Sequence, residues 1–130
     1  MWPPELKYTK SHEWVRVEGD IVTMGITEFA VKHLSDLVFI DLPEVGQAVK
    51  QGESFAEIES VKAVADVYAA VTGEVAEVNE TLSDEVETIS GDCYGKGWIV
   101  KIKMSDASEV ESFMDADAYA KHAEAAGEEA

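Results

Sequence analysis

The sequence lacks most features of a secreted, disulfide-bonded or membrane-spanning chain. One cysteine, Cys93, excludes an intrachain disulfide and offers no paired thiols for a structural zinc site. Basic residues are few, 10 against 27 acidic ones, and the net charge of −17 disfavours binding to nucleic acid or anionic membranes. No apolar run approaches the roughly 18 residues of a membrane span, and residues 1–5 do not resemble a signal peptide. We expect a cytoplasmic protein, or one of the mitochondrial matrix if a transit peptide has been removed.

Length and composition are those of one small domain. The chain has 130 residues, 46% of them hydrophobic, which is enough for one core and too little for two comfortable ones. We expect a single domain over residues 1–130 that is monomeric. Its partners should be proteins or neutral ligands, with neither nucleic acid nor membrane among them.

Alternation of apolar and polar residues predicts antiparallel β-structure along most of the chain. Two alternating runs, 14–18 and 21–24, are joined through Glu18-Gly19-Asp20 and predict a hairpin. In the run 38–42, which ends at Pro43, Val38 shares a face with Ile40. The clearest alternation covers 98–104. Periodicity therefore predicts the strands, but not how they are arranged.

Two segments have helical signals instead. Thr27 can cap a short helix over 28–34, which has an acidic residue in its first turn. From Ser105 onward the apolar period becomes helical, which predicts a C-terminal helical extension over about 105–130. Its last residues, from Glu124, are expected to be frayed.

A lysine stands between two strand-like segments in the middle of the chain. Residues 54–59 and 64–68 are rich in strand formers, so 60–63 is predicted to be a short hairpin connection that carries Lys62 outward. A lysine in a turn is usually only a solvated charge. Here its neighbours Val61, Ala63 and Val64 gain nothing by facing water, which indicates a surface that another protein, such as a modifying enzyme, must recognise.

Six ordered blocks of sequence match one known family. The most specific is Glu59-Ser60-Val61-Lys62-Ala63, because related lipoyl domains of 2-oxo acid dehydrogenases resemble Asp-Lys-Ala around their lysine and biotin carriers resemble Met-Lys-Met. The other blocks are 6–15, 25–30, 38–46, 72–75 with 77–80, and 94–98. Over nearly its whole length the chain resembles the H proteins of the glycine cleavage system.

This resemblance implies a fold, a cofactor and partners. The fold is mainly β, a flattened barrel-sandwich hybrid of the lipoyl or biotinyl type with two antiparallel sheets, a short inserted helix and C-terminal helices. Lys62 would carry lipoate in amide linkage, and a lipoate-attaching enzyme would recognise Glu59, Ser60, Val61 and Ala63 around it. The lipoyl group would take an aminomethyl group from glycine decarboxylase (P protein) to the aminomethyltransferase (T protein), and dihydrolipoamide dehydrogenase (L protein) would reoxidise it. The chain is expected to be a carrier and not an enzyme.

The resemblance also implies a cleft that shelters the loaded arm from water. By motif position its lining is Ser11, Glu13, Leu34 and Asp66. Glu13 and Asp66 would hold the cationic amine as charge-assisted acceptors, although either could instead be a solvated carboxylate. His12 is expected to have a structural role, and no metal site is expected.

Other functions stay open at this point. A lipoylated H-like protein could act mainly as a lipoyl donor to other lipoate-dependent complexes. An independent hydrolase or transferase would need a catalytic dyad, and pairing Cys93 with one of the three histidines has no supporting motif. The histidines lack metal-ligand spacing, and the glycine-rich segment 91–97 lacks the spacing and the following Ser or Thr of a phosphate loop.

Two positions depart from the family's pattern. Ser35 stands where the family has glycine in Leu-Gly-Asp, and Cys93 stands where a proline often precedes Tyr-Gly. Both lie in predicted loops away from Lys62, and the loss of glycine at 35 matters only if that residue needs a positive φ. We expect these changes to alter the docking of one partner at most.

Overall fold

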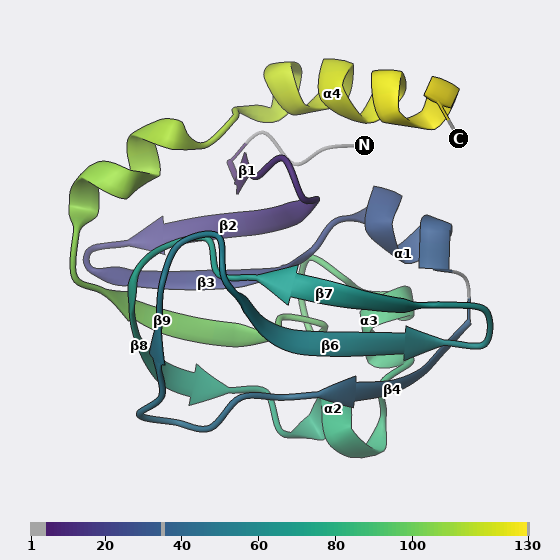
Figure 1. Cartoon of the computed structure of the whole chain (residues 1–130), viewed down its shortest axis with the longest axis horizontal. Coiled ribbons are helices and arrows are strands. Elements are labelled where there is room, and N and C mark those ends of the chain that lie inside the picture. The colour runs from purple at the N-terminus through teal and green to yellow at the C-terminus, as the bar shows by residue number, and fades with distance from the viewer. Residues whose placement is uncertain (1–4, 35, 130) are drawn as a thin grey trace.

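A computed structural model describes residues 5–34 and 36–129, with side chains up to Glu124, and shows two antiparallel sheets facing each other (Figure 1). The larger sheet has the strand order β1 (Lys7–Tyr8), β2 (Glu13–Glu18), β3 (Ile21–Ile26), β9 (Val100–Met104), β8 (Gly73–Val78), β5 (Ala48–Val49). The smaller sheet has the order β4 (Leu37–Asp41), β6 (Ser54–Ser60), β7 (Val64–Tyr68). This confirms the predicted mainly β, barrel-sandwich fold. Ser35 lies outside the described residues.

The first hairpin forms as the sequence predicts. Strands β2 and β3 pair in antiparallel register, with Val15 opposite Met24 and Val17 opposite Val22. Gly19 in the connection has φ +64, a left-handed conformation that glycine adopts at little cost. The hairpin therefore carries one apolar face into the core and leaves Val17 at its exposed end.

Helix α1 (Glu28–Leu34) also matches its prediction. The Thr27 side chain accepts a hydrogen bond from the Ala30 N–H at 3.4 Å, and the Thr27 carbonyl accepts one from Val31 at 3.0 Å. The helix buries Val31 and Leu34 against the core. In Figure 1 the helix lies above β7, on the side of the molecule where β6 and β7 turn back on each other.

Two predicted strands differ in detail from the structure. In β4 the register shifts between Leu37 and Phe39, so the prediction that Val38 shares the face of Ile40 was wrong: Val38 is exposed while Ile40 is buried. A bulge inserts one extra residue and reverses the alternation beyond it. Strand β9 begins at Val100, two residues later than the alternation predicted.

Two short helices were not predicted. Helices α2 (Thr81–Asp84) and α3 (Thr88–Gly91) have four residues each, so neither is long enough to produce a helical period in the sequence. Each one buries a single large side chain completely, Leu82 in α2 and Ile89 in α3. They close one end of the space between the sheets.

The C-terminal segment is helical, as predicted, but interrupted. The 3₁₀ helix η1 (Ala107–Ser112) is followed by a backbone pairing in which Met114 and Tyr8 exchange two hydrogen bonds of 2.8 Å, and then by helix α4 (Ala116–Glu129). Helix α4 continues through Glu129, so the backbone is helical where a frayed tail was expected. Among the described residues, no helix is long and apolar enough to cross a membrane.

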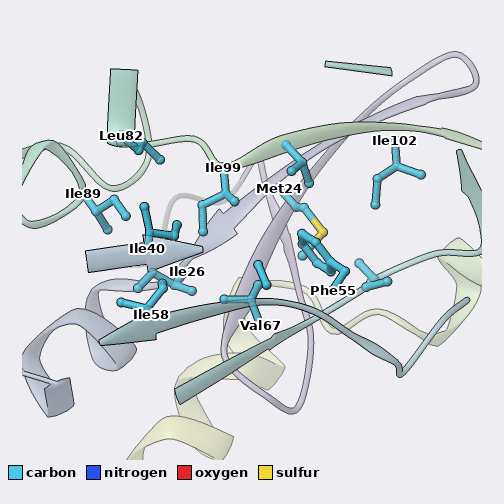
Figure 2. Close-up of a cluster of buried hydrophobic side chains, with 14 of the residues drawn as sticks. Met24, Ile26, Ile40, Phe55, Ile58, Val67, Leu82, Ile89, Ile99 and Ile102 are labelled. Atoms are coloured by element: carbon cyan, nitrogen blue, oxygen red, sulfur yellow. The ribbon is translucent and has the colours of Figure 1, made fainter. Parts of the chain in front are cut away.

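The core lies between the two sheets. Figure 2 shows side chains from both sheets and from α2 and α3 meeting there, and each fully buried Leu, Ile or Phe contributes roughly 1.5–3 kcal/mol. The labelled members are Met24, Ile26, Ile40, Phe55, Ile58, Val67, Leu82, Ile89, Ile99 and Ile102. A second cluster, here called the terminal cluster, joins the two ends of the described chain. Its buried members are Leu6, Tyr8, Trp14, Tyr119 and Ala123.

Candidate functional site

The connection between β6 and β7 presents Lys62 at the tip of a hairpin. The Ser60 N–H donates to the Ala63 carbonyl at 2.8 Å, and the buried Ser60 side chain accepts from the N–H groups of Ala63 at 3.1 Å and Lys62 at 3.4 Å. A serine hydroxyl therefore holds the turn where the sequence offers no Asn-Gly or Asp-Gly pair. The tip is also tied to the segment just before β4, because the Val61 N–H donates to the Asp36 carbonyl at 3.0 Å.

Apolar side chains surround Lys62 on the surface. Lys62 is exposed, and its neighbours Val61 and Val64 are 68% and 60% exposed. On the adjacent strand β4, Val38 and Phe39 are about half exposed. These four apolar residues, here called the hairpin patch, lie at the same end of the smaller sheet. Their exposure is typical of a surface that contacts another protein.

A row of carboxylates crosses the same face of the smaller sheet. Glu57 of β6 is opposite Asp41 of β4 on one side and opposite Asp66 of β7 on the other, and all three are exposed. Like charges directly opposite each other on neighbouring strands are destabilising. We call these three residues the acid row. Two residues nearer the tip along β6, Glu59 adds another negative charge on this face, between Phe39 and Val64.

A pocket of about 140 Å³ opens beside this hairpin. Three segments form its walls: the loop 11–13 before β2, helix α1 with the end of β3, and strands β6 and β7. All four residues that sequence reasoning placed in the cleft line this one pocket: Ser11, Glu13, Leu34 and Asp66. The other lining residues are His12, Ile26, Phe29, Ala30, His33, Ile58, Ala65 and Val67.

Glu13 is a buried carboxyl at the wall of this pocket. Only 1% of it is exposed, and it accepts hydrogen bonds from the Ser11 hydroxyl at 2.6 Å, from the Thr9 hydroxyl and from the Tyr68 N–H at 3.3 Å. Burial raises the pKa of Glu13 above its ordinary value, and the hydrogen bonds from Ser11, Thr9 and Tyr68 oppose that rise. The next residue, Trp14, is fixed by a 2.7 Å bond from its ring N–H to the Cys93 carbonyl. Glu13 is therefore rigidly aimed.

Asp66 is a different kind of carboxylate. It is exposed at the mouth of the pocket, where it accepts a 3.1 Å hydrogen bond from the Ser54 hydroxyl. Water and salt screen an exposed carboxylate strongly, whereas they screen a buried one little. Of the two predicted acceptors for a cationic ligand, the Glu13 carboxylate would therefore attract the cation more strongly.

The three histidines meet at the rim of the pocket. The ring of His12 stacks on Phe29 at 4.4 Å and on His122 at 5.2 Å between centroids, and Phe29 in turn stacks on His33 at 6.2 Å. Burial, and then the nearby His122 and His33, lower the pKa of His12 to about 4. The imidazole therefore stays neutral at physiological pH and adds no positive charge to the pocket. His12, for which a structural role was expected, lines the pocket together with His33, and its role stays a prediction.

Sequence reasoning missed several residues of this site. Phe29 and His33 are four residues apart on α1 and so share a helix face, a signal that was available. Tyr119 and His122 are about a hundred residues from His12, and no local pattern could have joined them. The backbone of Tyr68 could not have been assigned to Glu13 from sequence either.

The alternative sites have little support. Cys93 is buried, and burial raises the pKa of its thiol to about 11, which makes it a poor nucleophile. Among the side chains that the structure describes, in residues 5–34 and 36–124, no group of three or more His, Cys, Asp or Glu is placed to hold a metal ion. The glycine-rich segment 91–97 contributes no residue to the pocket described above.

Comparisons with known proteins agree on one family. A family model described as "Glycine cleavage H-protein" matches residues 6–126. A glycine cleavage system H protein from Escherichia coli is 56% identical over 118 residues, which cover 90% of this chain and 92% of that protein. One from Cyanothece sp. is 52% identical over 118 residues, covering 91% of this chain and 92% of that protein. The crystal structure of an H protein from Mycobacterium marinum matches with a TM-score of 0.84 and 41% identity, covering 92% of this chain and 96% of that chain.

Proposed function

This chain belongs to the glycine cleavage H-protein family, and from that premise we propose that it is a carrier that holds lipoate in amide linkage on Lys62. One observation supports the assignment most directly. An exposed lysine stands at the tip of a hairpin whose second strand forms a wall of a pocket with a buried carboxyl. Carriers need an attachment point on the surface and a shelter within reach of it.

The residues present fit a lipoyl arm. The pocket walls are mostly apolar, with Phe29, Leu34 and Ile58 among them, and they suit a hydrocarbon chain. Acylation of Lys62 removes its positive charge, so the arm can lie against the exposed Val61 and Val64 without leaving an ammonium unsolvated. When bound, lipoate supplies a dithiolane that accepts an aminomethyl group and later releases it.

The distance from tip to pocket suits a swinging arm. Asp66 is three residues beyond Ala63 along β7, so it lies about 10 Å from the end of the turn at the ordinary rise of a strand. An arm attached at Lys62 can therefore fold back toward the pocket or extend toward a partner. Glu13 and Asp66 would hold a cationic cargo there, Glu13 from the buried side and Asp66 from the mouth.

The surface around the lysine suits several protein partners in turn. We propose that the lipoate-attaching enzyme recognises the hairpin patch, which includes Val61, together with Glu59, Ser60 and Ala63. The acid row would attract basic surfaces on the glycine decarboxylase (P protein), the aminomethyltransferase (T protein) and dihydrolipoamide dehydrogenase (L protein). The chain itself supplies no catalysis, and we place it in the cytoplasm as a monomeric single domain.

The buried carboxyl favours the carrier over a simple lipoyl donor. A protein that only passes lipoate to other complexes has no use for a pocket that holds a cationic amine. Glu13 is almost wholly buried, and burial of its charge costs stability, so a selected role for that charge is the simplest account. We therefore prefer aminomethyl transport to lipoyl relay as the main function.

The test is the intact mass of the purified chain, with peptide mapping, after expression with the lipoate-attaching enzyme and lipoate. We expect one lipoyl group on the wild-type chain at Lys62 and none on Lys62→Arg. A matched control is Lys50→Arg, because Lys50 is also exposed in a turn before β6 but lacks the hairpin patch. It should be modified like the wild type. A lipoyl group on Lys62→Arg, or none on the wild type with an active enzyme, would overturn the assignment.

A further inference from the structure

Tyr119 of α4 lies at the junction of two walls of the pocket. Its side chain is completely buried, and its hydroxyl lies 2.7 Å from His12 Nδ1 and 2.7 Å from Thr27 Oγ1, both within hydrogen-bond distance. His12 belongs to the pocket loop, and Thr27 caps α1. The Thr27 N–H also donates to the His12 carbonyl at 3.0 Å. One hydroxyl from a distant helix thus joins the loop wall to the helix wall.

The loop depends on such contacts because its backbone is strained. His12 has φ +71, a left-handed conformation that costs an L-residue with a side chain roughly 1–2 kcal/mol. Surrounding contacts must hold a residue in that conformation. Ser11 and Glu13 flank His12, so the direction of both pocket side chains depends on this one turn. If the His12 ring were released, both neighbours would move with the backbone.

Helix α4 contacts the same loop a second time. His122, three residues after Tyr119 and therefore on the same helix face, stacks its ring on that of His12 and makes a 2.9 Å contact from Nε2 to the Lys10 carbonyl. Tyr119 is itself held by its stacking on Tyr8, with centroids 4.7 Å apart and planes 11° apart. The helix thereby grips residues 10–12 from outside the pocket.

We propose that α4 is a clamp for the arm pocket, in which Tyr119 is a positioning residue that fixes Ser11 and Glu13 through His12. The proposal rests on the proposed function for the meaning of the pocket, but not for the clamp itself. None of the α4 side chains that the structure describes, up to Glu124, lines the pocket, so the effect of Tyr119 on it is indirect. Loosening the clamp would admit water to the cargo while leaving Lys62 and its hairpin unchanged.

The first measurement uses the unlipoylated chain and Tyr119→Phe, which removes only the hydroxyl. Amide hydrogen exchange by NMR should speed up by about tenfold at His12, Glu13 and Thr27, as expected when a shared buried hydroxyl loses its hydrogen bonds. The pKa of the His12 imidazole should rise from about 4, because a loosened ring is less buried and burial is the largest cause of its lowered pKa. A role in overall stability alone would change neither locally.

A matched control weakens a half-buried hydrogen-bonded contact at a distant place. Glu109 of η1 accepts from the Thr72 N–H at 2.6 Å and from the Thr72 hydroxyl at 2.8 Å. Glu109→Gln weakens that contact and should leave exchange at His12 and Glu13, and the titration of His12, as in the wild type. If both variants affect the pocket loop equally, the clamp is refuted.

His122→Ala gives a second perturbation of the clamp that leaves the buried hydroxyl in place. It should speed exchange at His12 and Glu13, by less than Tyr119→Phe does. Exchange is the readout for this variant, because His122 itself lowers the pKa of His12. If Tyr119→Phe does not fold, this variant decides: an unchanged loop would overturn the proposal. In the lipoylated chain, both variants should lose a bound aminomethyl group to water several-fold faster than the wild type. Because the exchange and titration need no lipoate, failure of Lys62 acylation would overturn the proposed function alone.

Discussion

Replacing Glu13 with glutamine should make the protein a worse carrier without making it less stable at neutral pH. The amide keeps the shape of the carboxyl and an oxygen that accepts from the Ser11 and Thr9 hydroxyls. It loses the acceptor for the Tyr68 N–H, which costs about 1 kcal/mol, and it removes a buried charge. These two effects oppose each other, and their balance depends on pH.

The sign of the pH dependence follows from the raised pKa of Glu13. A carboxyl whose pKa is higher in the folded than in the unfolded chain contributes stability at acid pH, and this contribution is lost as the pH rises through the folded-state pKa. Glutamine has no such loss. The free energy of unfolding of Glu13→Gln, relative to wild type, should therefore increase between acid and neutral pH. The increase is about 1.4 kcal/mol for each pH unit between the two pKa values. Urea unfolding at several pH values measures it.

Retention of the cargo should change in the opposite direction. A hydrogen bond from an ammonium to a buried carboxylate is worth about 1.5–3 kcal/mol, so without it the aminomethyl group should be lost about 10 to 150 times faster. The loss consumes one water and yields formaldehyde, ammonium and the free thiol, so formaldehyde release from the loaded chain gives the rate. Asp66→Asn is the matched control: its carboxylate is exposed, and the rate should rise no more than about fivefold. A Glu13→Gln chain that keeps its cargo as long as wild type would refute the role of this carboxyl.

Three further predictions concern the hairpin, the acid row and the sheet. Ser60→Ala removes the hydroxyl that holds the turn, and should slow acylation of Lys62 several-fold in a timed mass assay while changing the free energy of unfolding by about 1 kcal/mol or less. Glu57→Gln relieves repulsion from acidic neighbours on both sides, and should raise the free energy of unfolding, measured with urea, by a few tenths of a kcal/mol at low salt and by less in high salt. Gly25→Ala should lower stability by about 1–3 kcal/mol, because its new Cβ would lie 2.7 Å from the buried Trp14 ring nitrogen; an unchanged thermal midpoint would contradict this.

Local patterns were enough to predict the elements that position the lysine. The alternation on each side of residues 60–63 predicted the β6–β7 hairpin, and Thr27 with its acidic first turn predicted α1. Both signals act between neighbours in sequence, and in this structure the tertiary contacts agree with them. The four predicted cleft residues, which came from family resemblance, line a common pocket, and their binding roles stay predictions.

What the sequence could not predict depends on contacts between distant segments. The bulge at Val38 arises from how β4 pairs with β6, and the alternation of β4 gives no sign of it. The pKa of His12 is lowered first by burial and then by His122 and His33 beside it, and these two histidines come from helices far apart in the chain. Helices α2 and α3 are single turns stabilised by one buried side chain each, which no periodicity can reveal.

The terminal cluster sets an order of events during synthesis. The hairpin that presents Lys62 is built from residues 54–68 and is tied to Asp36 and β4, so its partners here all precede it in the chain. The pocket loop is held by Tyr119, which leaves the ribosome some fifty residues after the hairpin. Tyr119 packs with Leu6, Tyr8 and Trp14, so the terminal cluster cannot form before then. A nascent or C-terminally truncated chain therefore displays the lysine before its shelter exists. Under the proposed function, such a chain would accept the arm but fail to protect what the arm carries.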